Sequence, residues 1–145
     1  MFGALFRTLY MARFARTAQI LLSTGVSVLD TLTISAGAMN NMVVEQSILN
    51  AAEKVKAGKP FSDAIRDQPY ILPLIPQMSA IGEQSGKMDE MLGKAAQVYE
   101  DEFDEKIAGI SAMIEPIMLL ALGGIAAILV AGVLFPIYAL VEKIS

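Results

Sequence analysis

Near its C-terminal end, the chain contains an apolar run that is long enough to cross a lipid bilayer. From Ile117 to Val141 there are 25 residues without a charge, and 14 of them are Leu, Ile, Val or Phe. At ~1.5 Å per residue, a helix of this length spans about 37 Å, more than the roughly 30 Å of a hydrocarbon core. The alternative is a buried helix of a soluble core, but such helices are usually shorter. We therefore predict a transmembrane helix over residues 114–141 and a short tail over residues 142–145.

Small residues follow one stripe of this predicted membrane helix. Gly123, Ala127 and Ala131 stand four residues apart, and small side chains at that spacing let a second helix approach closely. Small residues are also common in membrane helices, so chance placement is an equal alternative to a packing role. The flanking charges do not set an orientation, because Lys106 precedes the run and Lys143 follows it.

Glu115 and Pro116 stand at the membrane edge of the run. An ionisable side chain is costly when it is buried in lipid. We expect Glu115 to lie among the headgroups, with pairing to another helix as the alternative.

The composition of the chain excludes several kinds of chemistry. There are no cysteines and no histidines, which excludes disulfides, thiol nucleophiles, histidine triads and Cys/His zinc sites. The net charge of −4 argues against nucleic-acid binding. A catalytic site would have to be built from carboxylates and lysines, and nothing in their spacing requires one. We expect no enzymatic activity, no cofactor and no metal site.

Residues 1–113 have the pattern of a small all-α domain. No convincing alternating strand pattern occurs, and apolar residues recur every three or four positions between break signals. Gly25, Asn40, Gly58 and Gly86 supply such breaks. The pattern predicts a bundle of six helices, at residues 6–24, 27–39, 43–57, 62–67, 74–84 and from 88 onward. The core of such a bundle is modest, so we expect association with further copies or the membrane to contribute to stability.

The last of these helices leads toward the membrane segment. Its apolar stripe consists of Met88, Leu92, Ala95, Tyr99, Phe103, Ile107 and Ile110. We predict one long helix, bent at Pro116, that runs from the domain into the bilayer.

An acidic run flanks that stripe and has three interpretations. It consists of Glu100, Asp101, Glu102, Asp104 and Glu105. Charge runs are most often solvated helix faces, which is the favoured interpretation. The alternatives are a docking patch for a basic partner and a weak cation site.

Two other charged features have open interpretations. Glu83 lies in the break near residue 85, where it either accepts backbone N–H bonds, contacts a neighbouring subunit or is an ordinary solvated carboxylate. Arg7, Arg13 and Arg16 lie on the first helix, where they either contact anionic lipid or form a solvated face.

Four stretches of the chain resemble one known protein family. The break Gly82-Glu83-Gln84-Ser85-Gly86-Lys87-Met88-Asp89 resembles the Gly-Glu-x-Ser/Thr-Gly-x-Leu-Asp/Glu turn of inner-membrane platform proteins in type II secretion systems and type IV pilus machines. Similar motifs occur in the family's order at residues 12–17 with 21–26, at Gly58–Ile65 and at Glu115-Pro116-Ile117. Together these stretches cover nearly the whole chain. The resemblance assigns Gly82, Ser85 and Gly86 to a structural turn.

The resemblance implies a place and a function for the chain. It implies a six-helix cytoplasmic domain at the bacterial inner membrane, with Ser145 near the periplasmic side. The expected partners are an assembly ATPase, pilin-like subunits, other inner-membrane components of the machine and further copies of the chain. Family members usually carry two such domains and three membrane helices, and this chain resembles the second domain and last helix. The implied function is that of a non-enzymatic scaffold subunit that couples the ATPase to pilin or pseudopilin assembly. The alternative is a tail-anchored helical adaptor that tethers a soluble partner to the membrane.

Overall fold

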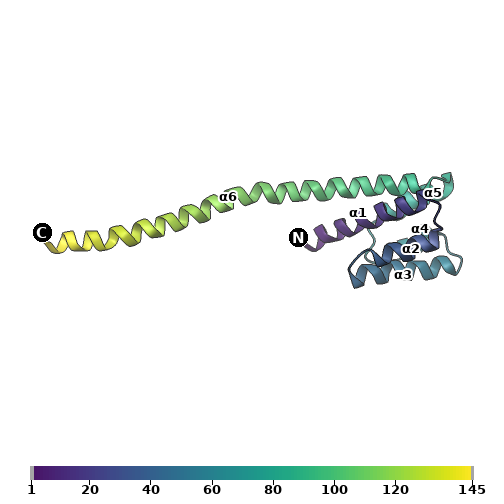
Figure 1. Cartoon of the computed structure of the whole chain (residues 1–145), viewed down its shortest axis with the longest axis horizontal. Helices are drawn as coiled ribbons and strands as arrows, with labels where there is room; N and C mark the ends of the chain where they lie inside the picture. Colours follow the sequence, from purple (N-terminus) through teal and green to yellow (C-terminus); the bar gives the residue numbers. More distant parts are fainter. Residues whose placement is uncertain (1, 145) are drawn as a thin grey trace. The chain divides into compact units, whose positions relative to one another are not determined.

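The computed structural model describes residues 2–144, with side chains from residue 3 onward, and this part of the chain forms six α-helices and no β-strand (Figure 1). The helices are α1 (Phe2–Ser23), α2 (Val28–Gly37), α3 (Met42–Lys56), α4 (Phe61–Arg66), α5 (Leu74–Ser85) and α6 (Met88–Ile144). The predicted all-α fold is confirmed, and α6 continues through Pro116 and Pro136 as one long helix.

The predicted start of the first helix is wrong by about one turn, and the starts of α2, α3 and α4 each differ by one residue. Helix α1 begins at Phe2 instead of near Phe6, and the added turn includes Leu5, which is buried. Helix α4 begins at Phe61, one residue before the predicted start, so Ser62 lies inside the helix. Pro60 takes the N-cap position, where its side chain offers no hydrogen bond to the helix.

Local chemistry explains where the other helices stop. Gly25 and Gly58 follow α1 and α3 with φ angles of 91° and 107°, a conformation that costs glycine little. Asn40 also has a positive φ of 54°, and the next residue, Asn41, caps α3 by accepting N–H bonds from Val43 and Val44. These are the breaks that the sequence predicts.

The chain divides into two compact units, the first ending at Glu105 and the second beginning at Lys106. Helix α6 contributes residues to both units. The predicted boundary after residue 113 falls within α6, in the second unit.

The first unit is a helical domain built around one apolar core. The largest fully buried apolar side chains are Phe14, Met11, Leu32, Met39, Ile48, Ile65, Ile75, Leu92 and Val44. Helix α6 contributes Leu92, Ala95, Ala96 and Tyr99 at helical spacing, while Phe103 is only half-buried. The buried stripe of α6 within this unit therefore ends near Tyr99.

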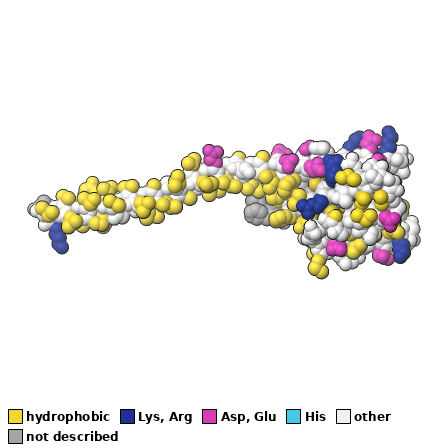
Figure 2. Space-filling model, in the orientation of Figure 1, with side chains coloured by type: hydrophobic (Ala, Val, Ile, Leu, Met, Phe, Trp, Pro, Cys, Tyr) yellow, Lys and Arg dark blue, Asp and Glu magenta, His cyan; other side chains and the backbone are white. Residues whose placement is uncertain are grey.

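The second unit is the apolar part of α6. Its most apolar window of 18 residues has a mean hydropathy of 2.7, and none of that window is buried. Figure 2 shows hydrophobic side chains along this part of the helix. The helix is long and apolar enough to cross a membrane, as the sequence predicts.

Candidate functional site

The turn between α5 and α6 is closed by two backbone hydrogen bonds to one carbonyl. Gly86 has a left-handed φ of 72°, and its N–H donates to the carbonyl oxygen of Gly82. The N–H of Lys87 donates to the same oxygen at 3.1 Å. Gly86 can adopt this conformation because it has no Cβ.

Gly82 and Ser85 have different roles in the same turn. A Cβ added to Gly82 would lie 2.6 Å from the Cα and 3.2 Å from the N of Met88, so the chain passes too close for a side chain. The hydroxyl of Ser85 donates to the carbonyl oxygen of Ile81 at 2.9 Å. The three glycine and serine positions that the sequence singles out thus lie together in one tight turn.

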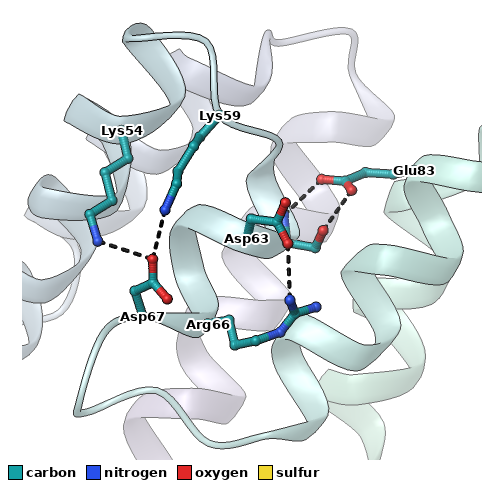
Figure 3. Close-up of polar contacts among 7 residues, drawn as sticks. Lys54, Lys59, Asp63, Arg66, Asp67 and Glu83 are labelled. Carbon is teal, nitrogen blue, oxygen red and sulfur yellow. Dashed lines mark hydrogen bonds and ion pairs between the residues drawn. The ribbon is translucent and has the colours of Figure 1, made fainter.

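Glu83 binds a neighbouring helix instead of its own turn (Figure 3). Its Oε1 accepts the backbone N–H of Ser62 at 2.7 Å, and its Oε2 accepts the Ser62 hydroxyl at 2.7 Å. Ser62 is buried, and the N-cap residue Pro60 offers no side-chain acceptor. Glu83 therefore satisfies an amide that the first turn of α4 would otherwise leave without a partner.

Ion pairs join the other end of α4 to α3 and to the loop that follows α3 (Figure 3). Asp67, the C-cap residue, accepts from Nζ of Lys59 at 2.8 Å and from Nζ of Lys54 at 3.3 Å. These two hydrogen bonds hold the pKa of Asp67 below its ordinary value. The short helix α4 is thus held at both ends by side chains from other parts of the domain.

Glu100, a member of the acidic run, joins α6 to α1 through a bidentate ion pair. Its Oε1 and Oε2 accept from Nε and Nη2 of Arg16 at 2.9 Å and 2.8 Å. Nη1 of Arg16 also donates to Gln19, whose side chain lies against Gly93 of α6. The hydrogen bonds from Arg16 lower the pKa of Glu100. Both side chains are about one-third exposed, so this pair fixes geometry more than it adds stability.

The rest of the acidic run faces solvent. Asp101, Glu102, Asp104 and Glu105 are exposed, and Asp101 accepts a hydrogen bond from Gln97 one turn earlier. At about 100° per residue, Asp101, Asp104 and Glu105 lie opposite the buried stripe of α6. We call these three residues the acidic face, and Figure 2 shows acidic side chains gathered along α6 ahead of its apolar part.

The carboxylates of the acidic run do not converge on one point. Among residues 2–144, no group of three or more acidic side chains is placed so that it could hold a metal ion. Consecutive side chains of a helix point in different directions, so carboxylates that are neighbours in sequence are not thereby close together in space.

The sequence did not identify the partners of the arginines on α1. Arg7 donates from Nε to the carbonyl of Tyr70 at 3.0 Å and from Nη2 to that of Pro69 at 2.8 Å, and it lies over the Tyr70 ring. It therefore anchors the α4–α5 connection, while Arg13 stays exposed. No local signal could have revealed the Arg7 contacts, because they join residues more than 60 positions apart.

In the second unit, all of the predicted membrane-helix residues lie exposed on α6. These are Glu115, Pro116, Gly123, Ala127 and Ala131. Exposure is what a membrane-facing or partner-facing helix requires, and the roles of these five residues stay predictions.

Comparisons with known proteins agree on one family. The family model described as "Type II secretion system (T2SS), protein F" matches residues 14–136. The chain is 39% identical to a type IV pilus assembly protein PilC of Thermus thermophilus, over 99% of this chain and 36% of that protein. It is 31% identical to a type II secretion system protein F of Pseudomonas aeruginosa, over 99% of this chain and 35% of that protein. The chain thus spans about a third of the length of these curated relatives.

Proposed function

Because the chain belongs to the family of type II secretion system protein F, we propose that it serves in the inner-membrane platform of a type IV pilus or type II secretion machine. In this proposal it is a non-enzymatic scaffold that couples an assembly ATPase to the assembly of pilin or pseudopilin subunits. The first unit lies in the cytoplasm, and residues 117–141 cross the membrane.

One observation carries this proposal. Helix α6 supplies core residues to the first unit, from Leu92 to Tyr99, and the same helix contains the uncharged run over residues 117–141. A movement imposed on the domain would therefore act on the same helix that contains the membrane run. The mechanism we propose is mechanical: the ATPase moves the domain, and α6 passes that movement to the membrane.

The acidic face is the surface that we assign to the ATPase. Asp101, Asp104 and Glu105 are exposed, whereas the carboxylates of Glu83 and Glu100 already have partners inside the domain. Complementary charge at such a surface acts mainly on encounter rate and specificity, and salt weakens it.

We expect the double substitution Asp104→Lys and Glu105→Lys to reduce binding of the full chain to its assembly ATPase by about tenfold at low salt. The reduction should shrink as the salt concentration rises, because screening removes the charge contribution. The measurement is a titration of the ATPase against the full chain in detergent micelles. Circular dichroism of each variant checks that the domain remains folded.

The matched control carries the same change in charge on another surface. Asp30 and Glu53 are exposed on α2 and α3, so Asp30→Lys with Glu53→Lys should leave ATPase binding nearly unchanged. Equal losses for the two double variants would refute the acidic face as the docking surface. A wild-type chain that does not bind the ATPase at all would favour the tail-anchored adaptor.

The membrane span has a separate test. We expect the full chain to stay with membranes after an alkaline carbonate wash, because residues 117–141 carry no charge. A chain that stops after Ile114 should appear mainly in the soluble fraction. Extraction of the full chain by carbonate would show that the run does not cross the bilayer.

A further inference from the structure

One face of α6 in the second unit carries a shallow groove of about 590 Å³. Ser111, Glu115, Met118, Leu122 and Ile125 line it in steps of four, three, four and three residues. This is the spacing of a seam between two helices that pack at a small crossing angle. The shape of the face thus fits a second helix lying along it.

The groove has a polar end and an apolar end. Met118, Leu122 and Ile125 form the apolar part, and Ser111 and Glu115 form the polar part. An ionised Glu side chain offers only acceptors. The carboxylate of Glu115 therefore calls for a partner that brings donors and positive charge to this end of the groove.

This groove does not coincide with the stripe of small residues. At about 100° per residue, Ala127 and Ala131 lie about 120–180° around the helix from Glu115 and Leu122, and Gly123 lies about a quarter turn away. A helix packed on Ala127 and Ala131 would therefore leave most of the groove uncovered. The groove thus has room for a separate helix.

We propose that the groove from Ser111 to Ile125 binds a transmembrane helix of a partner protein that presents a Lys or Arg side chain, or another cationic group, at the level of Glu115. The apolar end gives shape complementarity, and the ion pair with Glu115 selects the partner, since a helix packed over this groove would cover the carboxylate and a covered charge without a partner is costly. A second copy of the chain is a poorer match, because residues 107–141 contain no basic side chain. The inference rests on the proposed membrane span.

The test uses the full chain in phosphatidylcholine vesicles with a designed transmembrane peptide as the probe. The chain has no cysteine, so Ile144→Cys provides a single site for a fluorescent donor. The peptide is a helix of roughly 20 Leu and Ala residues with blocked ends, an acceptor dye and one Lys at the level of Glu115. A second peptide has Leu in place of that Lys.

We expect energy transfer to report association with the Lys peptide about three to ten times tighter than with the Leu peptide. Glu115→Gln should remove this preference, and Glu142→Gln, at the other end of the run, should retain it. Met118→Trp should weaken binding of both peptides by filling the groove.

Equal association with the two peptides, or a preference that survives Glu115→Gln, would overturn the proposal. Self-association of the chain that Glu115→Gln weakens by the same factor would assign the groove to a second copy and would also overturn it. Carbonate extraction checks insertion independently, so a chain that is inserted but does not discriminate the peptides refutes this inference alone.

Discussion

Replacing Gly82 with Ala is expected to destabilise the first unit by about 2–3 kcal/mol, because the new Cβ would press against the backbone of Met88. Backbone atoms cannot rotate away as a side chain can, so α5 and α6 would have to separate at the turn. Gly86→Ala is expected to cost less, about 1 kcal/mol. No atom lies within 4 Å of a Cβ there, and only the positive φ of 72° opposes the substitution.

The measurement for both glycines is thermal unfolding of the full chain in detergent micelles, followed by circular dichroism. A loss of 2–3 kcal/mol should lower the midpoint by about 10 °C or more. Gly37→Ala is the control, since its Cβ also meets no atom within 4 Å and its φ is not positive. A smaller loss at Gly82 than at Gly86 would contradict the close approach of the two helices.

Replacing Glu83 with Ala is expected to destabilise the first unit by about 1–3 kcal/mol. The substitution would leave the buried N–H and hydroxyl of Ser62 without their acceptors, and unsatisfied buried groups carry a full desolvation cost. Glu83→Gln should cost less, because its amide oxygen can still accept from the backbone. The measurement is the same unfolding transition.

A double-mutant cycle separates this contact from a general effect of the turn. Ser62→Ala removes the hydroxyl, so the losses from Glu83→Ala and Ser62→Ala should be less than additive. Gln84→Ala changes the neighbouring exposed residue and should alter stability by less than about 0.5 kcal/mol. Additive losses would show that Glu83 acts elsewhere than on Ser62.

The role of Glu83 depends on the tertiary structure. The sequence leaves a backbone contact, a subunit contact and a solvated position open for this carboxylate. The structure shows it bound to the backbone of α4, in a contact that joins residues 21 positions apart. Asp101, Asp104 and Glu105 of the acidic face, by contrast, are exposed on α6.

The sequence alone determined the helices and the membrane run, because the physical causes of both are local. Glycines at positive φ, the cap at Asn41 and the three-to-four periodicity act within a few residues. A run of 25 uncharged, mostly apolar residues favours an apolar environment because of its own composition, independently of the rest of the fold. These features predicted the all-α fold and most of the helix boundaries.

Only the tertiary structure decided which charged side chains face inward to partners and which face solvent. Glu100 and Glu105 stand in the same acidic run, yet Glu100 binds Arg16, 84 positions away, and Glu105 is exposed. Arg7 likewise finds its acceptors more than 60 positions away. Which helix faces meet depends on how the whole core packs. The pairing of a surface charge therefore follows from long-range geometry, which the local pattern of residues does not contain.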